Sequence, residues 1–361
     1  MRSPQEHLND LKRFLAPHLD SFNWAVTKGF GNIISWSLPV ETTQTEGGQV
    51  LKLRVADLSI SNPHDDRGEK IYPYQCRLGG TTYGSTLKVA VEASLDGVVQ
   101  QTINLLANNI PVMVGSILCN LRGMNPDQLM EKMEERTEAG GFFICNGYEK
   151  ILRLIIQNRQ NYIFAVQRAS YTSRGQYFSS YATSFLSMAP DCSCVTTNLH
   201  FLTTGQIMVQ VPIQRRMYFV PLPVILRALV EVEDKTIYTD IMGSKKESFI
   251  SDRVLAMLSI TAKYERHTKA ACKEFLGANF RTALQLPGHF TNKQVADILL
   301  ARYLFPHLTG SHPSEKYKLL IQMARRLLAF VKGEVSADNM DANAFHEILT
   351  PGSLWLALLS D

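Results

Sequence analysis

An Asn-Gly pair between two apolar runs, in the segment GGFFICNGYEKILRLIIQ, is the feature that most constrains the fold of this chain. A type I′ turn needs a positive φ at both central positions, and Asn146 followed by Gly147 meets that need. We therefore predict a tight β-hairpin here. Glu149 and Lys150 follow the turn at once, so the segment is either a catalytic acid and base or a structural corner.

Two glycines, Gly140 and Gly141, come just before this hairpin. They follow the charged segment DQLMEKMEERTEA, which Asn125 and Pro126 introduce as a helix. We predict that this helix runs up to the two glycines, which would end it as a C-terminal cap. Residues 110–121, ahead of this helix, are predicted to form a buried strand or a short helix.

The composition is that of an ordinary globular protein, with 361 residues, 45% hydrophobic and 19% charged, which is enough for two or more domains. The net charge of +4 permits contact with nucleic acid without requiring it. The six cysteines are sparse and irregular, as in reduced proteins. Residues 1–20 are polar, so no secretory signal is expected. No apolar run is long enough to predict a membrane span.

The hydrophobic pattern predicts an α+β protein. Residues 4–30 should form two short helices that break at Pro17, and residues 50–60 and 87–95 alternate like strands of a half-buried sheet. Residues 142–220 are rich in strand formers, and residues 224–301 are mostly helical, with Thr291 as an N-cap.

A polar linker at residues 309–315 precedes an amphipathic helix that we expect to end at Gly333. The last predicted helix begins after Pro351 and is cut off after barely three turns, so we expect the chain to be part of a longer protein.

Several motifs that carry chemistry in other proteins fail on closer inspection. RLGGTTYGS lacks the Gly-Lys-Ser/Thr of a phosphate-binding loop. Cys192 and Cys194 supply at most two of the four ligands that structural zinc needs. Asp338 and Asp341 lack the glycine and glutamate of a calcium loop, so a solvated loop is expected. We therefore predict no catalytic residue, no bound metal and no cofactor in this chain.

A series of segments, in order, resembles the second-largest, β-like subunit of multisubunit DNA-directed RNA polymerases. GGFFICNGYEKILR is similar to the family signature, whose residues here are Gly140, Gly141, Phe143, Gly147, Glu149 and Lys150. CRLGGTTYGSTLKVAV, IPVMVGSILCNLRGM and the segment that starts YKLLIQMARRLLAFVKGE also resemble family elements. HLDSFN and the Leu-Thr-Pro-Gly form of the last element point to the RNA polymerase I form. The resemblance covers nearly the whole chain.

The resemblance implies an N-terminal fragment with two mixed α/β domains. Residues 1–167 and a truncated returning segment, 315–361, would form the protrusion, and residues 168–314 would form the lobe inserted into it. Family members hold their catalytic Mg²⁺ and their Zn²⁺ outside this region, so both metals are expected only in the full polymerase. Glu149 and Lys150 would then form a structural ion pair or act as hydrogen-bond partners to the turn backbone.

The resemblance also implies partners and a cellular location. The expected partners are the largest subunit, a heterodimer that resembles TFIIF, a small zinc-ribbon subunit at the lobe, initiation factors at the protrusion, and DNA in the intact complex. Transcription of ribosomal RNA genes would place the protein in the nucleus and nucleolus. The fragment would form a wall of the DNA cleft and would be inactive alone.

Two alternatives remain open at this point: an independent nucleic-acid-binding or scaffold module, and the equivalent subunit of another nuclear RNA polymerase. Residues 166–185 bear on the first, because they interleave basic and aromatic side chains that could contact nucleic acid. The candidates are Arg168, Tyr171, Arg174 and Tyr177. A strand pair with half-buried tyrosines explains the same pattern.

Overall fold

The computed structural model describes residues 4–36, 40–43, 50–65, 67–214, 216–243, 247–262, 267–286, 288–308, 310 and 312–360. The chain divides into two compact units. Unit 1 comprises Met1–Gln157, Pro190–Cys192 and Ile348–Asp361, and unit 2 comprises Asn158–Ala189 and Ser193–Glu347. Each unit mixes helices with antiparallel strands, which confirms the predicted α+β class.

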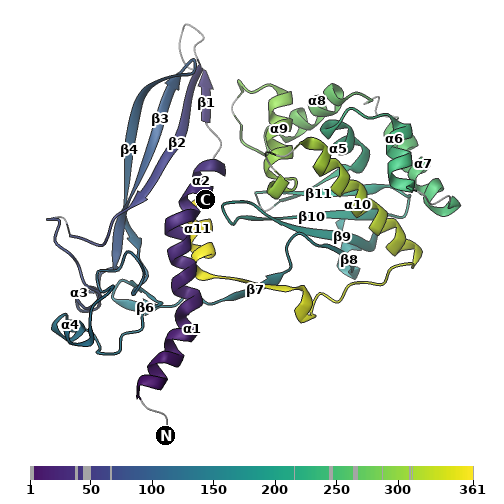
Figure 1. The fold of residues 1–361 in the computed structure, drawn as a ribbon. Coiled ribbons are helices and arrows are strands. Elements are labelled where there is room, and N and C mark those ends of the chain that lie inside the picture. The colour runs from purple at the N-terminus through teal and green to yellow at the C-terminus, as the bar shows by residue number, and fades with distance from the viewer. Residues whose placement is uncertain are drawn as a thin grey trace. The chain divides into compact units, whose positions relative to one another are not determined.

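One group of helices in unit 1 comes from both ends of the sequence. Helix α1 (Pro4–Trp24) continues through the π-turn η1 (Ala25–Gly29) into α2 (Phe30–Trp36), so the predicted break at Pro17 is wrong. Pro17 lies on the exposed side of α1, where water can satisfy the carbonyl group that loses its partner. Helix α11 (Pro351–Ser360) packs against α1, as Figure 1 shows.

A single tryptophan joins these helices. The ring of Trp355 in α11 lies 4.9 Å from that of Phe22 and 6.0 Å from that of Phe30, measured between centroids. Gly352 allows the close approach, because a Cβ there would lie 1.9 Å from the carbonyl oxygen of Ser21.

Unit 1 also contains a four-stranded antiparallel sheet in the order β1-β2-β3-β4. Its strands are β1 (Val40–Thr43), β2 (Val50–Ile60), β3 (Gly84–Leu95) and β4 (Val98–Pro111). The two strands predicted from alternation at residues 50–60 and 87–95 are confirmed.

The remainder of unit 1 is a set of short elements and turns. They are α3 (Pro73–Gly79), α4 (Pro126–Glu131), β5 (Phe143–Cys145), β6 (Tyr148–Lys150) and β7 (Ile155–Asn158). Asn125 begins α4 as predicted, but the helix ends at Glu131, well before the two glycines. Residues 112–121 form buried turns rather than a strand or helix, because their backbone pairs with neighbouring loops.

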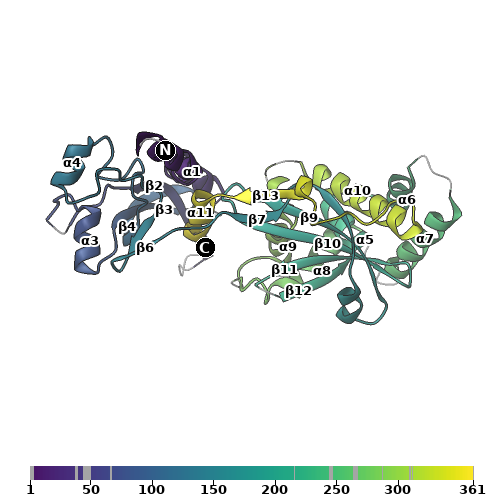
Figure 2. The ribbon, with the colours of Figure 1, turned by 90° about the horizontal axis from the view of Figure 1, so that it is seen from below.

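Unit 2 is a five-stranded antiparallel sheet in the order β12-β11-β10-β9-β8 with helices on one face (Figure 1 and Figure 2). The strands are β8 (Ile163–Gln167), β9 (Phe178–Met188), β10 (Cys194–Leu202), β11 (Ile207–Ile213) and β12 (Arg216–Pro221). The helices are α5 (Leu222–Leu229), α6 (Asp234–Met242), α7 (Ser248–Ala262), α8 (Lys269–Phe280), α9 (Asn292–Arg302) and α10 (Pro313–Lys332). Thr291 caps α9, and Gly333 ends α10, as predicted.

The bounds of unit 2 differ from those of the predicted insertion, residues 168–314. Strand β8 pairs with β9, so unit 2 starts before residue 168. Helix α10 also belongs to unit 2, because its apolar side buries Leu320, Met323 and Leu327 in the core formed with the sheet and the other helices. The 3-10 turn η4 (Asn343–Phe345) and the short strand β13 (His346–Leu349) then lead back to α11 in unit 1.

No helix among the described residues is both long enough and apolar enough to span a membrane.

Candidate functional site

The signature segment forms a corner at which backbones approach closely. Gly140 and Gly141 have φ angles of 73° and 86°, in the region that favours glycine. A Cβ on Gly140 would lie 2.5 Å from the carbonyl oxygen of Val114. The Gly141 N–H donates to that same oxygen over 2.9 Å. The glycines therefore join this segment to the buried turns that follow β4.

The predicted hairpin is confirmed. Asn146 and Gly147 have φ angles of 53° and 80° and connect β5 to β6, in which Cys145 pairs with Tyr148. A Cβ on Gly147 would lie 2.8 Å from Gly80 Cα, and its N–H donates to the Thr81 carbonyl over 2.8 Å. The turn is therefore held directly against the end of α3.

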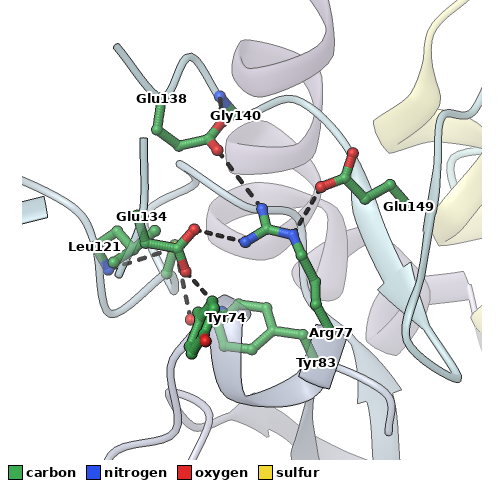
Figure 3. Close-up of polar contacts among 9 residues, drawn as sticks. Tyr74, Arg77, Tyr83, Leu121, Glu134, Glu138, Gly140 and Glu149 are labelled. Atoms are coloured by element: carbon green, nitrogen blue, oxygen red, sulfur yellow. Dashed lines mark hydrogen bonds and ion pairs between the residues drawn. The ribbon is translucent and has the colours of Figure 1, made fainter. Parts of the chain in front are cut away.

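Glu149 pairs with Arg77 rather than with its neighbour Lys150. The Arg77 Nε donates to Glu149 Oε1 over 2.7 Å (Figure 3). Adjacent residues in a strand point to opposite faces, so Lys150 cannot follow Glu149 into this cluster. It instead lines an apolar pocket of about 380 Å³ with Phe143, Trp355 and other residues of unit 1.

Arg77 binds two further carboxylates. Its Nη1 donates to Glu134 Oε2 over 2.6 Å, and its Nη2 lies 3.6 Å from Glu138 Oε2 (Figure 3). The Glu134 side chain is only 1% exposed and also accepts the Tyr74 N–H over 2.6 Å. Glu138 accepts the Gly140 N–H over 2.9 Å. One guanidinium thus connects α3, the loop after α4, the signature glycines and β6.

The electrostatics of this cluster are those of a structural joint. Burial by itself would lower the pKa of Arg77, but its hydrogen bonds and charge interactions with Glu134 and Glu149 outweigh it and raise that pKa. Burial raises the pKa of Glu138, against the opposing effects of the Gly140 N–H and Arg77. All three carboxylates are engaged with the guanidinium, which leaves no free base beside a nucleophile.

Sequence reasoning did not single out Arg77, Glu134 or Glu138. Arg77 lies 57 residues before Glu134 and 72 residues before Glu149 in the sequence. No local spacing rule connects side chains that far apart. The only sequence signal was that Arg77 and Glu149 each fall in a segment that resembles the same family.

The basic-aromatic stretch of unit 2 is only partly turned inward. Its 3-10 turn, η2 (Ala169–Arg174), covers the sheet face opposite the helices and buries Tyr171. The Arg174 guanidinium lies 4.3 Å from the centre of the Tyr171 ring and contacts His200 and Gln210. Burial lowers the pKa of His200 to about 4, so this ring is neutral near pH 7.

The four candidate nucleic-acid contacts are therefore not all accessible. The buried Tyr171 ring is not available to stack on a base, and Arg174 interacts with groups of its own unit. Tyr177 is 54% exposed with a positive φ of 71°, and Arg168 is also exposed. Only these last two keep the predicted accessibility.

Within the described ranges, no three His, Cys, Asp or Glu side chains are placed to share a metal ion. Asp338, expected in a solvated loop, is instead bound within unit 2. It accepts the Ala165 N–H over 2.6 Å and pairs with Arg326 Nη2 over 2.8 Å. Cys192 is buried, whereas Cys194 is exposed.

A comparison with known families decides what this corner belongs to. The family model for the RNA polymerase beta subunit matches residues 13–356. The chain belongs to the RNA polymerase beta subunit family. The resemblance predicted from the ordered motifs is therefore confirmed, and the Arg77 cluster lies inside the family's matched region.

Three of the similar curated proteins illustrate the relationship, and all three are subunits of RNA polymerase I. The chain is 32% identical to the human DNA-directed RNA polymerase I subunit RPA2, over 97% of this chain and 31% of that protein. It is 33% identical to the probable RPA2 of Schizosaccharomyces pombe, over 98% of this chain and 31% of that protein. It is 32% identical to RPA135 of Saccharomyces cerevisiae, over 87% and 27%. The chain thus spans about a third of the length of these relatives.

Proposed function

We propose that this chain is the N-terminal, non-catalytic part of the second-largest subunit of RNA polymerase I, which transcribes ribosomal RNA genes in the nucleus and nucleolus. The family match over residues 13–356, together with RPA2 relatives along almost the whole chain, is the observation that carries this proposal. In this role the fragment contributes to a nucleotidyltransferase without performing the chemistry itself.

Unit 1 would serve as the protrusion and unit 2 as the lobe, and together they would form a wall of the DNA cleft. The Arg77 cluster supports a rigid role for unit 1, because one partly buried ion-pair network connects four of its segments. The largest subunit, a TFIIF-like heterodimer, a zinc-ribbon subunit and initiation factors are the proposed partners. Mg²⁺ and Zn²⁺ would be bound only in the complete enzyme.

Affinity purification of the tagged protein from its own cells tests the assignment. We expect mass spectrometry to recover the largest subunit of RNA polymerase I at near-equal amounts. Recovery of the largest subunit of another nuclear polymerase instead would reassign the paralogue, and recovery of no polymerase subunit would refute the proposal.

Two assays on the purified chain test whether it lacks catalytic activity and strong DNA binding of its own. With Mg²⁺, nucleoside triphosphates and a primed template, we expect no extension of the RNA primer. With a short DNA duplex at low salt, we expect at most weak binding. Primer extension by the chain alone would place the chemistry in this fragment, whereas tight binding with steep salt dependence would favour an independent nucleic-acid-binding module.

A further inference from the structure

Strand β4 is a free edge of the sheet in unit 1. It is 14 residues long and pairs with β3 on one side, and no described strand pairs with its other side. Figure 1 shows it as the outermost strand of the sheet. An edge strand presents a row of unpaired backbone N–H and C=O groups, which is a template for another strand.

This edge lacks the usual protection against strand pairing. Proteins commonly place charged residues, especially lysine, or proline on exposed edges. The segment 98–110 of β4 contains neither, although β2 and β3 carry Lys52, Arg54, Lys88 and Glu92. Irregularities in the β3–β4 register are confined to the two ends, so residues 101–107 offer a regular edge.

The two faces of this edge differ in chemistry. Ile103 and Leu105 lie opposite Val91 and Val89 on an apolar face and are 40% and 55% exposed. The other face carries Thr102 and Asn104 together with Leu106, which lies opposite Lys88 and is 66% exposed. A strand added here must therefore cover Ile103 and Leu105 on one face. On the other face it meets two neutral polar side chains and Leu106.

We propose that β4 pairs with β4 of a second copy of this chain, in antiparallel orientation about a two-fold axis at Ile103. That register places Ile103 opposite itself, and places Gln101 opposite Leu105 of the second copy on the same face. Thr102 then lies opposite Asn104 of the second copy, where their side chains can form hydrogen bonds. The strand has no charge, so no like charges meet across the axis.

The symmetry explains why a second copy suits this edge. A two-fold contact uses the same patch on both copies and closes after two subunits. The two four-stranded sheets then become one sheet in which both unprotected edges are covered. This inference does not depend on the proposed polymerase role, because it concerns the free chain.

Sedimentation velocity from about 1 to about 100 µM tests the proposal, since a dimer in exchange depends on concentration. We expect a species of twice the 40.6 kDa chain mass to grow with concentration. Ile103→Lys should weaken the dimer by roughly tenfold or more, because it places two lysines opposite each other. Leu154→Lys, an equally exposed apolar site of unit 1 outside β4, should leave it intact.

A charge swap tests the register. Ile103→Glu alone should weaken the dimer to a similar degree, whereas a mixture of Ile103→Glu and Ile103→Lys should form a mixed dimer that high salt weakens. Circular dichroism melts verify that each variant is folded. A wild-type chain that stays monomeric, a dimer that survives both Ile103 substitutions, or a mixture that fails to associate would each overturn the proposal.

Discussion

At the scale of single residues, Arg77 and Lys316 show two ways of burying a cation. Arg77 is surrounded by carboxylates, so its charge is balanced. Lys316 has no such partner: its Nζ donates to the carbonyl groups of Leu300 and Leu304, over 2.7 Å each, and to that of Ala301 over 3.2 Å. These carbonyls lie at the end of α9 and just after it, where a cation is favourable. The two sites should therefore respond differently to mutation and to pH.

Arg77→Met should destabilise the chain by about 3 to 5 kcal/mol, because it leaves the buried Glu134 carboxylate without its counter-charge. Urea unfolding measures this change. Glu149→Gln is the matched control, since the Glu149 side chain is 53% exposed. It should cost less than about 1 kcal/mol, as exposed ion pairs do. Equal losses in the two variants would contradict the unequal burial of the two carboxylates.

Lys316 should make stability rise with pH above neutrality. Burial lowers its pKa from 10.5 to about 8. Between those values the unfolded chain binds more protons than the folded one, so the free energy of unfolding increases with pH. The maximal contribution to the slope is about 1.4 kcal/mol per pH unit. Lys316→Met should lack this contribution when both proteins are unfolded in urea from pH 7 to about 11. Identical pH profiles would refute the assignment.

At the scale of elements, the glycines of the signature matter for two separable reasons, backbone conformation and space. Gly140 has a positive φ, and the position of a Cβ on it is also occupied by Val114. Gly97, in the turn between β3 and β4, has a φ of 87° but open space around it. A comparison of substitutions at Gly97 and Gly140 therefore separates the effect of a positive φ from that of steric crowding.

Gly97→Ala should cost about 1 to 2 kcal/mol, from the left-handed conformation alone. Gly140→Ala should cost a further 1 to 3 kcal/mol or so, because the backbone at Val114 must move. Chemical denaturation of both variants gives the comparison. A smaller loss at Gly140 than at Gly97 would mean that the corner can relax.

Elements whose determinants are local could be predicted from the sequence. Asn146-Gly147 and Gly333 were predicted correctly because a positive φ is a property of the residue itself. The break at Pro17 was wrong, since exposure on the helix surface made the proline tolerable. The Arg77 cluster could not be predicted, because its partners meet only once the chain has folded. The amphipathic pattern of α10 likewise does not say which unit receives its apolar face.

At the scale of the whole molecule, each unit has a core of its own. The largest buried cluster, which includes Leu199, Leu276 and Leu327, lies entirely within unit 2. Phe22 and Trp355 contribute to the core of unit 1. All three tryptophans, Trp24, Trp36 and Trp355, also belong to unit 1. Tryptophan fluorescence should therefore follow unit 1 alone.

Phe22→Ala should shift the fluorescence-detected unfolding of unit 1 and cost about 3 to 5 kcal/mol. Leu276→Ala, in the core of unit 2, should shift the transition in far-ultraviolet circular dichroism and leave the fluorescence transition in place. Coincident shifts in both signals for both variants would show that the two units unfold as one cooperative body.

The hydrogen bond between the Arg159 N–H and the Phe345 carbonyl, 2.7 Å long, joins the first and last segments of unit 2. The point of entry and the point of exit of this insertion are therefore neighbours, as is common where a domain has been spliced into another. The same closure makes unit 2 the natural piece to excise, graft or exchange between paralogues.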